Sequence, residues 1–464
     1  MCIAATGSTE LAEKVAAASG AELRLAGINW VFSPVADVNT NPRNPVIGPR
    51  SFGDGTKRHS SLPSSCSHTP TDPTRVGEFA RAVNRGLTAT GIAACAKHFP
   101  GHGDTYVDSH LGLPRILKPL DELWRVELVP FRSLIATDVA TDVATVMTGH
   151  MAIPNISRSD IPCSLSRDIT TGLLRDKLGF KGVIVTDCLE MNPVAQSYGV
   201  ENGALMALNA GADIVMACHT PAKQKGAVES VRAAVASGKL TLDSLRESER
   251  RIARLKSEFA GSWSDVLDPV FDSGRITQLK SENAVLSASA YSASTALVAD
   301  PTGILPISGA DAVVLFTPGS VPLNRAADDP NKAPHPNMSF ASFIAARTQN
   351  FHHAFYTEGF TLTEELGRGL LAAKYIVFAT RNADRIPWQL QTLSTIVRVK
   401  SAGTQVIVVS TGAPYDLLNA KLEFPFACLA TFEFTRPAFE AVTRVIFGKT
   451  KPTGKVPVLD GNVL

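Results

Sequence analysis

Short apolar runs alternate with helix-patterned stretches through the first half of the chain. The apolar runs have the length and the β-branched content of buried strands, and they lie at 28–35, 92–97, 143–148, 183–186 and 213–217. Helical patterns separate these runs, for example at 75–88, 120–136 and 170–178. A repeated strand–helix succession predicts parallel strands joined by right-handed crossovers. The chain is therefore predicted to be an α/β protein with either a doubly wound sheet or a (β/α) barrel.

Polar side chains follow most of these candidate strands. Asp37 comes after the first strand, Lys97 and His98 end the second, His150 follows the third and Asp187 follows the fourth. Barrel enzymes take their functional groups from the carboxyl ends of several strands. A doubly wound sheet concentrates them at one crevice, and no GxGxxG motif follows a strand here. The pattern favours a TIM-like (β/α) barrel. Fewer clear strands precede residue 260 than a closed barrel needs, which predicts a barrel that is incomplete at its N-terminus.

One segment is dense in ionisable side chains. Residues 97–105 read Lys-His-Phe-Pro-Gly-His-Gly-Asp-Thr, and Asp-Ser-His follows at 108–110. Proline and glycine exclude a regular helix here, so the segment is predicted to be a loop directly after a buried strand. Loops in that position carry the chemistry of many α/β enzymes, and this one is the first candidate for a functional site.

The pattern of the chain changes near residue 260. A charged helical stretch at 228–259 is expected to end a first domain at 1–260, and a mixed polar linker is expected at 261–285. A smaller α/β sandwich domain is predicted for 286–464. Its expected strands are 312–317, 375–379, 405–410 and 426–431, and its expected helices are 340–347, 362–373 and 388–401.

Composition argues against several classes of protein. A net charge of +2 over 464 residues gives no electrostatic basis for binding nucleic acid, and Arg250-Arg251 is interpreted as part of a solvated helix face. Seven cysteines without a CxxC pair indicate reduced, mostly buried thiols. No signal-peptide pattern and no long apolar run is present, so we expect a cytoplasmic protein with no membrane partner. The oligomeric state is not indicated.

Several ordered segments resemble family 3 glycoside hydrolases, and in particular their β-N-acetylglucosaminidase branch. Besides 97–110 they are 32–39, 44–53, 146–150, 182–191 and 447–458, so the resemblance covers nearly the whole chain. It implies a (β/α) barrel catalytic domain with a second α/β domain, and retaining hydrolysis of terminal β-linked N-acetylglucosamine. A family motif of the Asp-Gln-Glu-Gly-Gly type has no match in the chain. We expect no cofactor and no metal.

The resemblance also implies catalytic roles. Asp187 would be the nucleophile that forms a covalent glycosyl-enzyme, and His110 would be the acid/base, oriented by Asp108. A neighbouring carboxylate fixes the tautomer of an imidazole and stabilises its protonated form, so the ring can protonate a leaving group and later deprotonate water. On the residues alone, Asp187 fits a helix cap equally well, and a surface histidine in a turn is the simpler interpretation of His110.

Other side chains are expected to bind the sugar or to support the site. Arg50, Lys97 and His98 are predicted to bind hydroxyl or N-acetyl groups of the terminal sugar. The alternatives are surface ion pairs for Arg50 and Lys97, and a satisfied core histidine for His98. The residues expected to support the site are Asp37, His102 and His150.

Four other functions remain open at this point. A neutral imidazole does not repel an anionic acceptor, so an N-acetylglucosaminide phosphorylase is one alternative. A family 3 β-glucosidase and an inactive, truncated sugar-binding homologue are two more. A metallohydrolase is the fourth, since all the following side chains are of metal-ligand types: His98, His102, Asp104, Asp108 and His110.

Overall fold

The chain forms two compact units. A computed structural model describes residues 1–55, 72–135, 142–267, 272–319, 336–418, 422 and 424–458. Of the described residues, the barrel unit contains those within 9–55 and 72–283, and the sandwich unit contains those within 1–8 and 284–458. The interval 261–285, expected to be a linker, contains α11 (Trp263–Leu267) and the first part of α12 (Ser273–Ser294).

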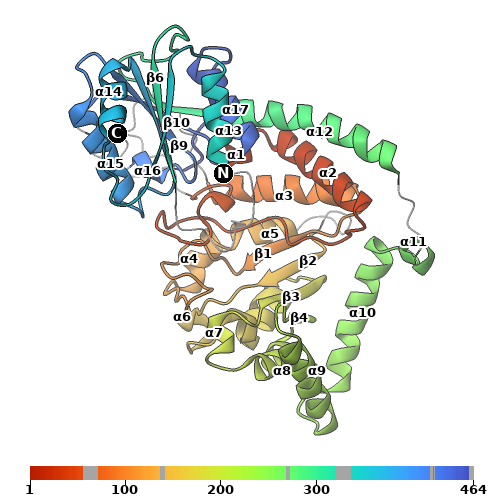
Figure 1. Cartoon of the computed structure of the whole chain (residues 1–464). Helices are drawn as coiled ribbons and strands as arrows, with labels where there is room; N and C mark the ends of the chain where they lie inside the picture. Colours follow the sequence, from red (N-terminus) through yellow and green to blue (C-terminus); the bar gives the residue numbers. More distant parts are fainter. Residues whose placement is uncertain are drawn as a thin grey trace. The chain divides into compact units, whose positions relative to one another are not determined.

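The barrel unit contains a parallel sheet whose described strands lie in the order β1, β2, β3, β4 (Figure 1). These strands are β1 (Cys95–Phe99), β2 (Thr145–Thr148), β3 (Val183–Cys188) and β4 (Ile214–Met216). The helices are α2 (Thr9–Leu25), η1 (Gly48–Arg50), α3 (Pro73–Ala89), α4 (Leu120–Arg125), α5 (Val129–Ile135), α6 (Pro154–Ser157), η2 (Cys163–Leu165), η3 (Asp168–Lys177), α7 (Asn192–Ala195), α8 (Val200–Ala210), α9 (Pro221–Ala236) and α10 (Leu242–Phe259). The predicted α/β class and barrel-like first domain are confirmed.

The segment 28–35, expected to be a strand, runs beside β1 but forms only isolated bridges there. Trp30 and Val35 each form one parallel bridge on the β1 side of the sheet. Pro34 has no backbone N–H and therefore interrupts a regular ladder. Its carbonyl still accepts a hydrogen bond from Lys97 N at 3.1 Å. The segment thus delivers Asp37 to the carboxyl end of β1.

Helix α3 illustrates the local signals that define the outer helices. Asp72 is its N-cap and accepts a hydrogen bond from Thr74 N at 2.9 Å, and a proline occupies the first helical position. Its apolar residues recur at helical spacing and form a buried face, and α3 packs against α2. A partly exposed ion pair of 2.7 Å between Arg85 and Glu13 joins the two helices, and a pair of this kind contributes about 0.2–1 kcal/mol.

A buried ion cluster ties α10 to the sheet. Asp213 is buried just before β4 and accepts hydrogen bonds from Arg251 and from Ser248, each at 2.7 Å. Arg175 pairs with the same carboxylate. The interpretation of Arg250-Arg251 as a solvated helix face is therefore wrong for Arg251, which reaches a buried carboxylate. Removing Asp213 would leave two partly buried guanidinium groups without their common partner, so this carboxylate is expected to be a structural requirement of the unit.

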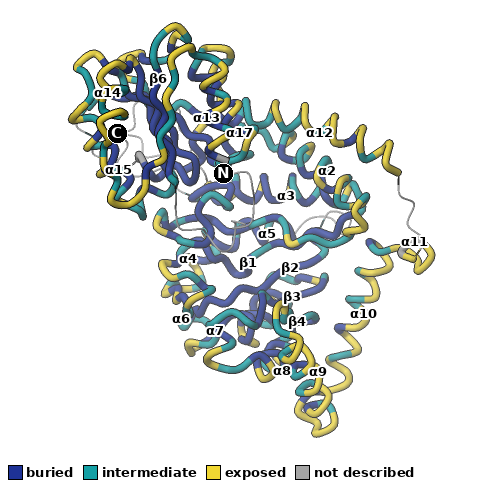
Figure 2. The backbone as a smooth tube through the Cα atoms, viewed as in Figure 1, coloured by how far each residue is buried: buried dark blue, intermediate teal, exposed yellow. Residues whose placement is uncertain are grey.

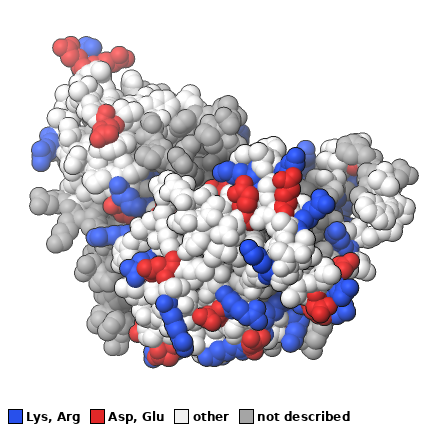
Figure 3. All heavy atoms as spheres, turned by 90° about the horizontal axis from the view of Figure 1, so that it is seen from below, with Lys and Arg blue, Asp and Glu red and all other residues white. Residues whose placement is uncertain are grey.

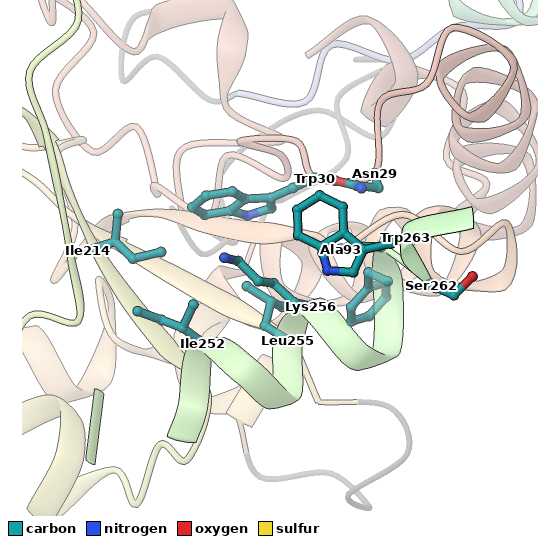
Figure 4. Close-up of a pocket in the computed structure, with 12 residues that line it drawn as sticks. Asn29, Trp30, Ala93, Ile214, Ile252, Leu255, Lys256, Ser262 and Trp263 are labelled. Atoms are coloured by element: carbon teal, nitrogen blue, oxygen red, sulfur yellow. The ribbon is translucent and has the colours of Figure 1, made fainter. Parts of the chain in front are cut away.

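An apolar pocket lies at the amino-terminal ends of the strands of this sheet. Its volume is about 420 Å³. Figure 4 shows Trp30 and Ile214 from the sheet side, with Ile252, Leu255 and Lys256 from α10, around this space. The residues that line the pocket include none of the candidate site residues. The pocket and the predicted chemistry therefore occupy different ends of the strands.

The sandwich unit has, within its described residues, a six-stranded sheet. The strand order is β5 (Ala296–Ala299), β10 (Phe426–Ala430), β9 (Gln405–Ser410), β8 (Tyr375–Thr380), β6 (Val313–Pro318) and β7 (Phe351–Tyr356), with β5 antiparallel to its neighbour and the other pairs parallel. The helices are α1 (Cys2–Ala5), α13 (Pro336–Ala345), α14 (Glu364–Ala372), α15 (Trp388–Val399), α16 (Tyr415–Leu418) and α17 (Arg436–Ile446). The predicted second α/β domain is confirmed.

Two hydrophobic clusters cover the two faces of this sheet. Leu315 and Val377 pack on the side of α13 and α17, whereas Phe316 and Phe378 pack on the side of α14 and α15. The central strands are dark blue in Figure 2 because both of their faces are buried. Strands buried on both faces have nearly continuous apolar sequences, which explains why the sequence pattern predicts them well.

Two carboxyl groups lie near the carboxyl ends of β8 and β9. Asp416 is buried and accepts hydrogen bonds from Ala383 N at 2.7 Å and from Ser410 Oγ at 3.3 Å. Burial and repulsion by the nearby Asp384 raise the pKa of Asp416 to about 8. The pair therefore holds a proton at neutral pH.

Raising the pH is expected to destabilise the sandwich unit through this pair. The pKa of Asp416 rises from its ordinary 3.8 to about 8 on folding, so the folded chain binds a proton that the unfolded chain has lost. The stabilising protonation is complete at acidic pH, and stability should fall as the pH rises from about 4 to about 8. In Asp416→Asn this slope should largely disappear. Urea unfolding between about pH 5 and 9 measures it, with the exposed Glu365→Gln as control. The same slope in Asp416→Asn and in the wild type would contradict the assignment.

Charged side chains of both signs are interspersed on the face shown in Figure 3. This agrees with the near balance of 45 Lys and Arg against 43 Asp and Glu in the whole chain. Over the described ranges, no helix has both the length and the apolar character needed to cross a membrane.

Candidate active site

The candidate site residues gather at the carboxyl ends of the parallel strands in the barrel unit. Lys97 and His98 lie on β1, His150 follows β2 and Asp187 lies on β3. Asp37 follows the segment that runs beside β1. Parallel strands present their carboxyl ends along one edge, so residues far apart in the sequence come together there.

Asp187 is a half-buried carboxylate near the end of a strand whose preceding residues are buried. Val183, Ile184 and Val185 precede it on β3 and are at most 1% exposed. Cys188 N donates a hydrogen bond to Asp187 Oδ1 at 2.8 Å. Burial favours the neutral acid, but the neighbouring histidines, this hydrogen bond and a lysine outweigh it and lower the pKa of Asp187 below its usual value. The side chain is therefore an ionised carboxylate at neutral pH.

Two basic side chains interact electrostatically with Asp187. Lys97 extends from β1, and Arg50 lies at the end of η1, where its Nη1 also donates to Val46 O at 3.3 Å. Burial lowers the pKa of both groups, and the negative charge of Asp187 opposes that shift. The structure thus places hydrogen-bond donors from two separate segments around one carboxylate.

Asp37 connects two histidines beneath the site. Its carboxylate accepts a hydrogen bond from His98 Nδ1 at 2.7 Å and another from His102 N at 2.7 Å. Burial would raise the pKa of Asp37, but the contacts with these histidines lower it overall. Burial lowers the pKa of His98 despite Asp37, so a neutral ring donates to a carboxylate. His98 is thus a satisfied buried histidine that also lies close to Asp187.

His150 is fixed at both ring nitrogens. Its Nδ1 lies 2.7 Å from Ser164 Oγ, and its Nε2 lies 2.9 Å from Cys188 O. The carbonyl can only accept, so Nε2 carries the proton and Nδ1 accepts from the serine hydroxyl. Burial lowers the pKa of His150 although Asp187 opposes the shift. The neutral ring therefore supports the turn that follows Asp187.

His110 and Asp108 form a hydrogen-bonded pair on the loop after β1. His110 Nδ1 lies 2.7 Å from Asp108 Oδ1, and the backbone N–H of His110 donates to the same oxygen at 2.8 Å. The hydrogen bond from the ring lowers the pKa of Asp108. Their side chains are 30% and 23% exposed. His110 interacts electrostatically with His150, and Asp108 does so with His102. The pair is thus near the strand ends but open to solvent.

Three polar residues that sequence reasoning did not single out hold this loop. Asn44 Nδ2 donates to His102 O at 2.8 Å and to Thr105 Oγ1 at 3.1 Å. Ser109 Oγ lies 2.8 Å from His102 Nε2. Gly103 has no room for a side chain, because a Cβ there would lie 1.7 Å from the carbonyl oxygen of Val38. The sequence could have pointed to Asn44, Thr105 and Ser109, because all three lie inside the segments that resemble the family.

The side chains considered as metal ligands are engaged in other contacts. Asp104 forms an ion pair of 2.9 Å with Lys118. His98 is bonded to Asp37, and both ring nitrogens of His102 lie within 2.9 Å of hydroxyl oxygens. In the part of the chain that the structure describes, no three His, Cys, Asp or Glu residues form a group that could hold a metal ion.

Comparison with protein families gives one match over the barrel unit. Residues 1–255 match the family model described as the glycosyl hydrolase family 3 N terminal domain. A β-hexosaminidase A of Pseudoalteromonas piscicida is 35% identical over 54% of this chain and 41% of its own length. A β-N-acetylglucosaminidase/β-glucosidase of Cellulomonas fimi is 30% identical over 66% of this chain and 52% of its own length. The chain spans about half the length of the curated relatives it matches.

Two solved structures are similar over the whole chain. A family 3 β-N-acetylglucosaminidase from Paenibacillus has a TM-score of 0.82 and 30% identity, and the match covers 100% of this chain and 82% of that one. A fungal multi-domain family 3 β-N-acetylglucosaminidase has a TM-score of 0.87 and 34% identity, with coverage of 100% and 50%. The resemblance found in the sequence segments is confirmed by these matches.

Proposed function

The chain belongs to glycosyl hydrolase family 3, and on this premise we propose that it is a retaining exo-β-N-acetylglucosaminidase. The observation that carries the proposal is the occurrence of an ionised, half-buried Asp187 and a hydrogen-bonded His110–Asp108 dyad in the same unit. Glycoside hydrolysis with retention needs a nucleophile and a separate acid/base group. The β-hexosaminidase and β-N-acetylglucosaminidase relatives support terminal β-linked N-acetylglucosamine as the substrate.

In the first step, Asp187 attacks the anomeric carbon of the bound sugar. The bond to the aglycone oxygen breaks as His110 gives its Nε2 proton to that oxygen, and the alcohol leaves. Asp108 accepts the hydrogen bond from Nδ1 and so fixes the tautomer and orientation of the ring. A covalent glycosyl-enzyme on Asp187 results.

In the second step, the ring acts as the base. Nε2 now lacks a proton and takes one from an incoming water, whose oxygen attacks the anomeric carbon and releases Asp187. Two displacements at one carbon return the original configuration. The released N-acetylglucosamine is therefore the β-anomer at first.

Arg50, Lys97 and His98 are proposed to bind the terminal sugar. Arg50 and Lys97 are mostly buried hydrogen-bond donors that interact with Asp187. The hydroxyl groups and the acetamide oxygen of a sugar are neutral acceptors that can bind such donors. Asp37, His102 and His150 are proposed as supporting residues, since each one is hydrogen-bonded within the site.

The test is hydrolysis of p-nitrophenyl N-acetyl-β-D-glucosaminide, followed by nuclear magnetic resonance to identify the first anomer released. The matching p-nitrophenyl β-glucoside separates the proposal from a β-glucosidase. We expect the protein to hydrolyse the N-acetylglucosaminide and not the β-glucoside, and the β-anomer to be the first product. A folded protein with no turnover would contradict the proposal and favour a non-catalytic sugar-binding protein.

Inorganic phosphate is expected to compete with water in the second step. A neutral imidazole does not repel an anion as a carboxylate base would, so phosphate can approach the glycosyl-enzyme. We expect N-acetylglucosamine 1-phosphate among the products when phosphate is added, measured by chromatography beside a sulfate control of equal ionic strength. If phosphate and sulfate give identical products, acceptor choice at this site is limited to water.

A further inference from the structure

The turn that carries the dyad is attached to the interior through a buried serine. Asp108 and His110 are partly exposed, whereas Ser109 between them is 2% exposed. Ser109 Oγ lies 2.8 Å from His102 Nε2. The turn closes on itself, since Leu111 N donates to Asp108 O at 2.9 Å. A longer contact of 3.4 Å joins Asn192 Nδ2 to Leu111 O.

His102 is itself held on three sides. Its backbone N–H donates to Asp37 Oδ1 at 2.7 Å, and its Nδ1 lies 2.9 Å from Thr105 Oγ1. The other oxygen of Asp37 accepts from His98 Nδ1 at 2.7 Å. Burial lowers the pKa of His102 to about 4, so the ring stays neutral through the pH range in which an ordinary histidine titrates. The contact with Ser109 is therefore the same in both halves of the catalytic cycle.

One path of hydrogen bonds thus connects the sugar-binding side of the site with the dyad. It runs from His98 through Asp37 and His102 to Ser109. A proton-transferring group must be held within hydrogen-bond reach of the reacting oxygen, and a displacement of about 1 Å can cost about 10²-fold in rate. Asp108 and His110 in the turn 108–111, named here the dyad turn, are partly exposed, so its one buried side chain, Ser109, is expected to determine where His110 lies.

We propose that Ser109 is a positioning residue, whose hydroxyl on His102 holds the dyad turn where His110 can exchange protons with the substrate. The inference rests on the proposed function and adds to it a residue that does not contact the sugar. Its loss should affect proton transfer to the leaving group and leave the attack by Asp187 intact. The signature is a dependence on the leaving group, which a general loss of structure would not produce.

The experiment compares two substrates in Ser109→Ala. In diacetylchitobiose the leaving group is a hydroxyl oxygen of the second sugar, which needs protonation, whereas dinitrophenyl N-acetyl-β-D-glucosaminide has a phenolate that leaves without it. Relative to the wild type, kcat/KM is expected to fall about 10- to 100-fold on the disaccharide and less than about 3-fold on the dinitrophenyl substrate. Ser109→Cys keeps the shape of the side chain with a larger atom and a weaker hydrogen bond, and it should give the same pattern to a smaller degree.

Ser164→Ala is the matched control. Ser164 Oγ makes an equivalent contact with His150 Nδ1 at 2.7 Å, and neither residue belongs to the dyad turn. Any loss in this variant should be similar on both substrates. Equal losses on both substrates in Ser109→Ala and Ser109→Cys, or no loss in either variant, would overturn the inference alone. A wild-type protein that turns over neither substrate would overturn the proposed function, and the role of Ser109 with it.

Discussion

Asp187→Ala is expected to reduce kcat/KM for p-nitrophenyl N-acetyl-β-D-glucosaminide by about 10⁴-fold or more, because the variant has no group that can form the covalent intermediate. The pKa of the half-buried Asp187 lies below its usual value, so the carboxylate is ready to attack without first losing a proton. Azide should restore part of the rate. It can enter the space left by the carboxylate and attack the face opposite the leaving group, so the product should be the α-glycosyl azide.

The control for this variant is Asp176→Ala, which removes an exposed carboxylate on η3 of the same unit. Its rate should equal that of the wild type, and circular dichroism should show both variants folded. A folded Asp187→Ala that keeps a rate near the wild-type value would contradict the role of Asp187. So would a β-glycosyl azide from this variant, because it would require a different nucleophile.

The strands that carry the site could be predicted because their sequences are apolar on both faces. The run before Asp187 and the run before Lys97 are buried from both sides, so their patterns needed no knowledge of their neighbours. The edge strands of the sandwich unit were not predicted. In β7 the exposed His352 lies within a half-buried strand, and β5 is a short edge strand, so neither has a continuous apolar run.

The contacts that hold the site depend on residues distant in sequence, and no local pattern encodes them. Arg251 was interpreted as solvated because its helix is highly charged, but its partner Asp213 is 38 positions away. Asn44 reaches His102 across 58 positions. Ser109 is a plain loop serine by sequence, and its importance follows only from the position of His102. The site residues were found by resemblance and by their place at strand ends, whereas their supports required the fold.

His110→Ala is expected to lower kcat/KM for p-nitrophenyl N-acetyl-β-D-glucosaminide by about 10²- to 10⁴-fold, the usual contribution of general acid–base catalysis. The two steps should respond differently, because the first can proceed with a good leaving group and the second still needs a base to activate water. On the dinitrophenyl substrate the glycosyl-enzyme should therefore accumulate, seen as a burst of dinitrophenolate and as an increase in protein mass by one sugar.

Azide distinguishes this variant from Asp187→Ala. In His110→Ala the glycosyl-enzyme on Asp187 still forms, and azide needs no base to attack it, so the product should be the β-glycosyl azide. Asp108→Asn should show the same pattern with a smaller loss, since the ring remains but its tautomer is no longer fixed by a carboxylate. His352→Ala, an exposed histidine of the sandwich unit, should behave as the wild type. An α-glycosyl azide from His110→Ala, or unchanged hydrolysis without a burst, would mean that a different group transfers the proton.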